Sequence, residues 1–371
     1  MASRPSSPPA PRAPRPSVRT SGLAVACCLA FTTPACGQGG TNGAAGPAGV
    51  QVVREAFVTP PAPADNLDSP ALWLGPDGQV RLLVTAKGSS RLRVFDARTG
   101  APLAGIGRPG RGPGQFRRPN GILVLGDLAL VVERDNRRVQ VLRLPGGRPL
   151  GSFGERVLRT PYGIAAVARG PGAWDVYVTD AYTGVLGRIP PDRQLGERVK
   201  RFRVRVDGDS VRAELLGSFG DTTGPGVLRQ VESIYPDPAH DRLLIADERS
   251  IDVKVYSLDG RYAGITVGRE YLRFEPEGIA LYACGRDDGY WIVTDQSLAA
   301  SFFHVLDRRS LRHLGVFRGA VTANTDGVAL TQLPVGGWEG GVFYPVHGDR
   351  SVAAIRWSDI ARALGLESCP P

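Results

Sequence analysis

The sequence of 371 residues contains very little lysine, histidine or methionine, and only 7% of it is aromatic. Arginine supplies nearly all of the positive charge, because lysine occurs only at Lys87, Lys200 and Lys254. The four histidines show no spacing typical of metal ligands. A Gly-x-Ser-x-Gly sequence, which carries the nucleophile of many serine hydrolases, does not occur. These absences argue against a histidine-ligated zinc site and against a hydrolase of that serine type.

Long helical patterns are absent as well. The chain has 48 glycines and 31 prolines, and both residues interrupt helix interiors. Short apolar stretches separated by turn residues dominate instead, which is typical of β-strands. Hydrophobic residues make up 42% of the chain, so a sizeable core can form. The sequence therefore predicts an all-β protein.

The N-terminal segment differs in composition from the rest. Residues 1–20 are rich in Pro, Ser and Arg and contain no acid, and residues 22–31 form an apolar run too short to span a bilayer. This pattern predicts a secretory signal over residues 1–36, followed by a Gly/Ala-rich linker over 37–50. Cys36 follows a small residue, as in a bacterial lipoprotein box, although Thr33 stands where leucine is usual. Lipidation at Cys36 and simple secretion both remain open, and both predict a location outside the cytoplasm, in the periplasm or at the cell surface.

The formal charge is +9, and the excess of arginine over lysine has two readings. It reflects either the codon bias of a GC-rich genome or an affinity for anionic ligands, since the guanidinium fork matches phosphate oxygens. No interleaving of aromatic and basic residues suggests nucleic acid. Composition alone leaves both readings of the arginine content open. We expect a monomer, with membrane contact only through a possible lipid anchor.

Two cysteines remain after residue 36, Cys284 and Cys369. In an oxidising compartment an even pair favours a disulfide. The bond would tie the C-terminal tail, residues 363–371, to the fifth repeat. Two unrelated buried thiols are the alternative.

A five-residue phrase recurs along the chain, at residues 66–70, 118–122, 160–164, 230–234, 275–279 and 324–328. We call each copy a corner phrase, because it stands at the start of a unit, before the first strand. Most copies are followed by an apolar strand that ends in an acid. Four short strands in each unit of about 40–50 residues predict a β-propeller. The longer third unit contains a hairpin signature around residues 207–209, which indicates one blade with lengthened strands. We predict a six-bladed propeller over residues 51–362, closed by residues 52–58 as the last strand of the ring.

The third position of this phrase becomes acidic in four copies, and carboxylates at equivalent positions of a propeller converge on its axis. The corner acids are Asp68, Glu232, Glu277 and Asp326, and the strand-end acids are Asp247, Glu248 and Asp295. Clustered carboxylates repel one another unless a cation neutralises them, and oxygen donors favour Ca²⁺ or Mg²⁺ over zinc. For any single acid, turn formation or a strand-end hydrogen bond is the ordinary alternative, but recurrence favours a metal cluster.

Several motifs together resemble the β-propeller phytases over most of residues 50–360. These motifs are Asp-Ser-Pro-Ala-Leu-Trp at 68–73, Val-Thr-Ala-Lys at 84–87, Arg-Pro-Asn at 118–120, Ala-Asp-Glu at 246–248, and residues 276–282, 289–296 and 325–327. Blade two, with residues 107–116 and 135–141, is more similar to NHL-type propellers. The resemblance implies a calcium-dependent, 3-phytase-like enzyme with several Ca²⁺ ions that releases phosphate from myo-inositol hexakisphosphate.

The same resemblance implies roles for individual residues. Asp68, Glu232, Asp247, Glu248, Glu277, Asp295 and Asp326 would hold the calcium ions, directly or through water. Glu232 and Asp326 are the two acids that we expect catalysis to require. Lys87, Arg118 and Arg134 would bind substrate phosphates, while the ions activate a water that attacks phosphorus.

Two departures from the phytase pattern keep a second function open. Ser69 stands where the family has the second aspartate of a pair, and Ala181 and Tyr182 stand near the place of a phosphate-binding lysine. The second function is a non-catalytic, calcium-stabilised cell-surface propeller that acts as a binding module. A propeller lactonase is a third and weaker reading, because it would need a single tight metal site.

Overall fold

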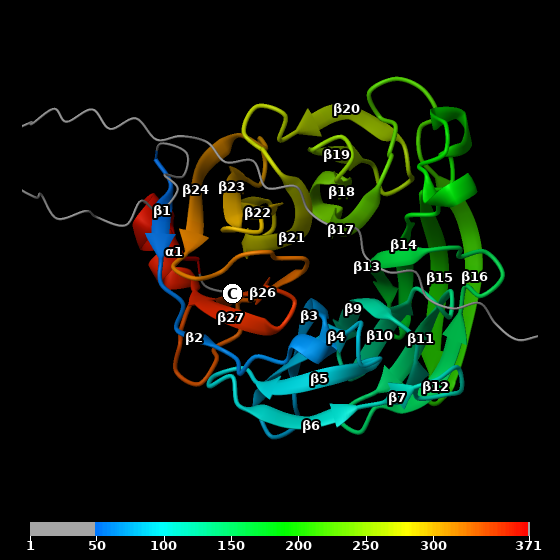
Figure 1. Cartoon of the computed structure of the whole chain (residues 1–371), viewed down its shortest axis with the longest axis horizontal. Helices are drawn as coiled ribbons and strands as arrows, with labels where there is room; N and C mark the ends of the chain where they lie inside the picture. Colours follow the sequence, from blue (N-terminus) through cyan, green and yellow to red (C-terminus); the bar gives the residue numbers. More distant parts are fainter. Residues whose placement is uncertain (1–48, 370–371) are drawn as a thin grey trace, which may run out of the picture. The chain divides into compact units, whose positions relative to one another are not determined.

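The computed structural model describes residues 49–369, and these form six sheets arranged as blades around a common axis (Figure 1). Five of these sheets are four-stranded and antiparallel, and the remaining sheet has a fifth strand that pairs parallel. The predicted all-β, six-bladed propeller is confirmed. The predicted signal segment 1–36, Cys36 and nearly all of the linker lie outside the described residues. None of the helices within 49–369 is long and apolar enough to cross a membrane.

The first three blades follow the order of the chain, from the innermost strand outward. Blade 1 comprises β3 (Leu67–Leu74), β4 (Val80–Ala86), β5 (Arg91–Asp96) and β6 (Pro102–Ile106). Blade 2 comprises β9 (Pro119–Leu125), β10 (Leu128–Glu133), β11 (Arg138–Arg143) and β12 (Arg148–Phe153). Blade 3 comprises β13 (Pro161–Gly170), β14 (Ala173–Asp180), β15 (Val199–Asp207) and β16 (Ser210–Phe219), so the long third repeat is a single blade.

The last three blades include the first and the last strands of the described chain. Blade 4 comprises β17 (Val231–Asp237), β18 (Arg242–Asp247), β19 (Asp252–Tyr256) and β20 (Tyr262–Val267). Blade 5 comprises β21 (Glu275–Cys284), β22 (Asp288–Gln296), β23 (Phe302–Asp307), β24 (His313–Gly319) and β1 (Gln51–Val53). Blade 6 comprises β25 (Val328–Thr331), β26 (Val342–His347), β27 (Ser351–Arg356) and β2 (Phe57–Val58).

A few short elements lie outside the blades. They are the parallel pair β7 (Arg108–Pro109) and β8 (Gln115–Phe116), the 3₁₀ turns η1 (Pro63–Asp65), η2 (Val185–Gly187), η3 (Asp192–Gln194) and η4 (Pro238–His240), and helix α1 (Trp357–Leu364).

The ring is closed by a strand from the N-terminal side of the chain. β2 pairs antiparallel with β27, with Phe57 opposite Ala354, and completes blade 6 as predicted. β1 takes a different place, because it pairs parallel with β24 as a fifth strand of blade 5, with Gln51 opposite Phe317 (Figure 1). The segment predicted as one closing strand is therefore divided between two neighbouring blades.

The C-terminal end folds back onto blade 5. Helix α1 buries Trp357, and the Trp357 ring stacks on Tyr282 with 3.8 Å between ring centroids. The helix spans the predicted boundary between propeller and tail at residue 362. Beyond it, Cys369 forms a disulfide with Cys284 in β21, with the two Cα atoms 5.3 Å apart. The tail is thus attached to the fifth repeat.

Adjacent blades pack face to face, because alternate side chains of a strand point to opposite faces of the sheet. Between blades 2 and 3, for example, Val132 and Val141 meet Ile164 and Val178 in one apolar cluster. Each fully buried aliphatic side chain of this kind stabilises the fold by roughly 1.5–3 kcal/mol. The core is therefore a series of layers between blades, and the axis is left for the channel.

The same pattern of hydrogen bonds recurs in two blades and connects neighbouring corner phrases around the axis. The hydroxyl of Thr179, at the end of β14, accepts a bond from Gly163 N–H (2.7 Å) and donates to the carbonyl of Glu232 in the next blade (2.8 Å). Thr85 makes the same two bonds in blade 1, to Ser69 N–H (2.9 Å) and Asn120 carbonyl (2.5 Å). These bonds fix the third corner residue of one blade against the preceding blade.

Glycine at the fourth corner position is required by this close approach. A Cβ atom on Gly121 or Gly163 would collide with the carbonyl oxygen of the third corner residue in the next blade. The corner backbones can therefore form a narrow ring, and the side chains at the third position gather at one end of the channel.

Candidate functional site at the channel mouth

The third corner positions form a ring of polar side chains at one end of the channel. In chain order this ring is Asp68, Asn120, Tyr162, Glu232, Glu277 and Asp326. All of them except Asn120 line a cavity of about 330 Å³, whose remaining wall is largely apolar and comes from the innermost strands. We call this end the channel mouth.

A second ring is formed by the residue that follows the second strand in each of blades 1 to 4. The N–H group of Lys87 donates to the carbonyl of Asn66 (2.9 Å), and that of Glu248 donates in the same way to Gln230 (3.0 Å). Arg134 and Ala181 make the equivalent bond in blades 2 and 3. These backbone bonds place the second-ring residues beside the corner of their own blade.

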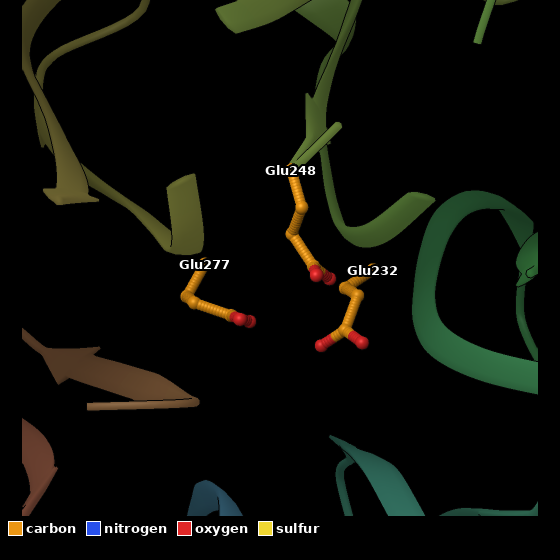
Figure 2. Close-up of side chains that lie close together, drawn as sticks. All are labelled: Glu232, Glu248 and Glu277. Atoms are coloured by element: carbon orange, nitrogen blue, oxygen red, sulfur yellow. The ribbon is translucent and has the colours of Figure 1, made fainter. Parts of the chain in front are cut away.

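Three glutamates from the two rings converge. One carboxylate oxygen from each of Glu232, Glu248 and Glu277 lies within 4.8 Å of the others. Figure 2 shows the three carboxyl groups pointing into one space from different segments of the chain. Glu277 is only 6% exposed and Glu248 only 8%, so water solvates these carboxylates poorly.

Lys87 is the cation that these carboxylates face. Its ammonium group donates to Asp326 at 2.6 Å and lies 3.9 Å from Asp68. The amide of Gln296 donates to the other oxygen of Asp326 (2.7 Å). One lysine cannot balance five ionised carboxylates at Asp68, Glu232, Glu248, Glu277 and Asp326, so their mutual repulsion opposes ionisation unless a further cation binds.

Some of the carboxylate oxygens are left without partners. Asp68, which is 1% exposed, has its Oδ2 atom without a hydrogen bond among the described residues, and the same holds for Oε1 of Glu248. A buried oxygen without a donor is costly, because it has lost its hydration with nothing in return. These oxygens are therefore suited to a positively charged ligand.

Burial and mutual repulsion shift the protonation equilibria of this group. Burial is the main cause that raises the pKa of Asp68 to about 8, against the opposing effect of Lys87. Burial and the charge of Glu232 raise the pKa of Glu248 to about 11. The pKa of Glu277 is raised well above its ordinary value for the same reasons. Although burial works against its charge, Lys87 has a raised pKa because Asp68 and Asp326 lie beside it.

The structure does not bring Asp247 or Asp295 into this cluster. Both oxygens of Asp247 accept backbone N–H bonds, from Arg229 (2.8 Å) and Gln230 (3.0 Å), and Lys254 lies 3.1 Å away. Asp295 accepts in the same way from Phe274 N–H (2.7 Å). The recurring acid at the end of the second strand therefore holds the segment that leads into its own corner. This is the strand-end hydrogen bond that competed with metal binding as an explanation.

The two predicted phosphate-binding arginines lie at the rim rather than in the cluster. Arg118 is exposed, and its carbonyl accepts a bond from Arg134 N–H (3.1 Å), so the two residues are neighbours in blade 2. The Arg134 guanidinium lies 3.7 Å from the carboxylate of the adjacent Asp135. Within the described chain, neither guanidinium forms an ion pair with a carboxylate of the channel mouth.

Ser69 occupies the fourth corner position of blade 1, where most copies have glycine. It lines the cavity next to Asp68, and its N–H group donates to Thr85. The carboxylate that the phytase pattern has there is thus replaced by a hydroxyl at the channel mouth itself.

Sequence reasoning missed three members of the site. Asn120 is fully buried, and both polar atoms of its amide lack a partner among the described residues. The Tyr162 hydroxyl lies 3.4 Å from Asp68, to which it donates. Gln296 holds Asp326, as described above. Asn120 and Tyr162 stand at the third position of their corner phrases. That position, whether acidic or not, could have identified both residues from the sequence.

No protein-family model matches this sequence, and no curated protein is significantly similar to it. The fold and the site define a six-bladed β-propeller with an acidic channel mouth. The resemblance to the β-propeller phytases rests on the motifs given above, and the propeller architecture is the part of it that the structure shows.

Proposed function

We propose that the channel mouth binds divalent cations and that Ca²⁺ is the preferred ion. The three converging glutamates carry this proposal, because their oxygens lie within 4.8 Å of one another and one of them has no hydrogen-bond donor. Carboxylate and amide oxygens are the ligands that calcium prefers, and the group contains no cysteine or histidine. Glu232, Glu248 and Glu277 would hold one ion, and Asp68 with Asn120 offers further unpartnered oxygens nearby.

We further propose that this site hydrolyses phosphate monoesters, with myo-inositol hexakisphosphate as the first substrate to test. A bound cation would neutralise phosphate oxygens and act as a Lewis acid on the ester. Lys87 would stabilise charge that develops on the phosphoryl group, since its ammonium lies among the carboxylates. Arg118 and Arg134 at the rim are placed to bind a second phosphate of a polyanionic substrate.

A non-catalytic binding module is the second candidate function, and a specific contact favours it. Lys87 already donates to Asp326 at 2.6 Å, and Ser69 replaces a carboxylate in the cavity wall. A lysine engaged in this way is less available for a phosphate. In this reading the cation serves only to stabilise the ring.

The deciding experiment measures two quantities on the same purified protein. Calcium should raise the unfolding temperature by mass action, and phosphate should be released from inositol hexakisphosphate only when calcium is present. Glu277→Gln should weaken both effects, whereas Glu214→Gln, an exposed position on β16, should change neither. A calcium-dependent thermal shift without phosphate release would favour the binding module, and the absence of both effects would reject the metal site.

A further inference from the structure

The most exposed large apolar side chains lie on the same face as the channel mouth. Leu186 is 89% exposed, Leu298 86% and Val185 84%. All three belong to loops that follow the second strand of a blade, which is where the second-ring residues of the mouth also lie. Apolar side chains on this face therefore project into solvent around the opening of the channel.

The tip with Val185 and Leu186 is presented by an ordered turn. Gly184 N–H donates to the carbonyl of Arg188 (2.8 Å), and Arg188 N–H donates back to Val185 (3.3 Å). Leu186 has a φ of 58°, a conformation that is unfavourable for a leucine. The turn thus holds two adjacent apolar side chains outward, although burial of either one would stabilise the fold.

The base of this loop, residues 181–198, is packed against the propeller. The buried guanidinium of Arg198 donates to the carbonyls of Asp180 (3.1 Å) and Tyr182 (2.7 Å). The Tyr182 ring lies between Arg159 and Arg198, each with its guanidinium carbon 4.4 Å from the ring centroid. The loop between β14 and β15 in Figure 1 is therefore anchored at both ends while its tip is exposed.

Unpaired arginines lie on the same face of the propeller as this tip. The exposed arginines on the mouth face of blades 2, 3 and 4 include Arg118, Arg137, Arg156, Arg188, Arg193 and Arg249. None of these six forms an ion pair within the part of the chain that the structure describes. They lie in the connections before blades 2 and 3 and in the loops after the second strands of blades 2, 3 and 4. This sector of the face therefore carries net positive charge.

Some of the acidic side chains in the same loops and connections are paired with arginine, whereas Glu155 forms no ion pair among the described residues and Glu248 faces the channel mouth. Asp192 pairs with Arg229 at 2.6 Å, and Glu197 pairs with Arg159. This pairing leaves fewer free acids than free arginines in the sector. An exposed apolar tip within a field of unpaired cations is the combination found in proteins that bind the interface of an anionic membrane.

We propose that the channel-mouth face docks on an anionic lipid bilayer, with Val185 and Leu186 inserted among the acyl chains and the six arginines beside lipid headgroups. Charge complementarity selects an anionic surface, and the apolar tip selects a bilayer over a soluble polyanion, which offers no apolar phase. Two apolar residues are too few for the core of a stable protein interface. Docking would turn the opening of the channel toward the lipid surface.

The test compares variants of the full chain in a Cys36→Ser background, so that lipidation cannot contribute. Binding to phosphatidylcholine vesicles with about one-third phosphatidylglycerol is measured by sedimentation. Val185→Ser/Leu186→Ser and Arg188→Gln/Arg193→Gln should each lower the partition coefficient about tenfold or more. Leu74→Ser is the matched control, because Leu74 is also an exposed leucine but lies at the opposite end of β3 from its corner. It should bind like the unsubstituted chain.

Further binding measurements distinguish a bilayer from other anionic partners. Pure phosphatidylcholine vesicles and high salt should both weaken binding, since the arginines act through charge. Equal binding by all variants would overturn the proposal. Tight binding to heparin, with vesicle binding unaffected by Val185→Ser/Leu186→Ser, would also overturn it in favour of a soluble polyanion. The substituted side chains are exposed, so unchanged thermal unfolding should confirm that each variant is folded.

Discussion

Asp247 and Glu248 are adjacent in the sequence but serve opposite sides of one corner. Asp247 accepts backbone N–H bonds from Arg229 and Gln230, whereas Glu248 directs its carboxylate toward Glu232 and Glu277 at the channel mouth (Figure 2). Neighbouring residues at a strand end point in opposite directions. Two similar acids therefore have separable roles.

This separation predicts opposite outcomes for two conservative substitutions. Asp247→Asn should lower the free energy of unfolding by about 2–4 kcal/mol, because it removes the charge that the corner N–H groups and Lys254 face, and Lys254 then keeps only Asp252 as its carboxylate partner. Its calcium-dependent thermal shift should persist. Glu248→Gln should leave the metal-free stability nearly unchanged at pH 5, where Glu248 is protonated in the folded state, and reduce the calcium shift. Urea unfolding with and without calcium measures both quantities, and a lost calcium shift in Asp247→Asn would contradict the assignment.

The metal-free protein should lose stability as the pH rises. The pKa of Asp68 is raised to about 8 in the folded state, and that of Glu248 to about 11, whereas both titrate near 4 when unfolded. Their protonated forms favour the folded state, so their contribution is full below pH 4. The contribution of Asp68 declines between about pH 4 and 8, and that of Glu248 between about pH 4 and 11. Each group changes the stability by up to roughly 1.4 kcal/mol per pH unit in its window.

Unfolding midpoints in urea at pH 5 and pH 8 test this prediction in the presence of a chelator. Added calcium should reduce the decline, since a cation stabilises the ionised carboxylates. Glu248→Gln should also reduce it. A chelated protein that is more stable at pH 8 than at pH 5 would show that other groups dominate the titration.

Lys87→Met should destabilise the metal-free protein by about 3 kcal/mol at pH 8, because it removes the cation from a buried ion pair. The loss should be smaller at pH 5, where Asp68, with its pKa raised to about 8, holds a proton. It should also be smaller with calcium. Lys87→Arg keeps the charge and serves as the control. An equal loss at both pH values would indicate that Lys87 acts through packing rather than charge.

The disulfide between Cys284 and Cys369 closes a long loop, with a sequence separation of 85. Cys284→Ser/Cys369→Ser should lower the free energy of unfolding by about 4 kcal/mol, mainly by freeing the unfolded chain. A reducing agent should destabilise the parent protein and leave the double variant unchanged. Peptide mapping without reduction should find the two residues cross-linked, and two free thiols would contradict the bond.

The blade number and the closure of the ring could be predicted because they follow from the repeated corner phrase. Each copy begins an innermost strand, and the spacing between copies leaves room for four strands. The place of β1 could not be predicted, because three residues contain no information on which blade offers an open edge. Helix α1 is only eight residues long and has no capping side chain, so the usual sequence signals of a helix are weak there.

The candidate site was only partly predictable for a geometric reason. The corner acids Glu232, Glu277 and Asp326 occupy the expected place, because the repeat sets their position on the ring. At the strand ends, adjacent side chains point in opposite directions. A shift of one residue therefore decides whether a carboxylate accepts backbone N–H bonds or faces the channel. Sequence spacing alone did not distinguish Asp247 from Glu248. The hydrogen-bond partners in the structure make that distinction.

Blade 6 has a consequence for how the protein is made. It combines β2 from the beginning of the described chain with β25, β26 and β27 from near its end. Synthesis proceeds from the N-terminus, so β2 leaves the ribosome some 300 residues before its partner β27. Until then both ends of the incomplete ring present open strand edges. The closed channel therefore exists only after translation is nearly finished, and a nascent chain arrested before β27 cannot complete the mouth.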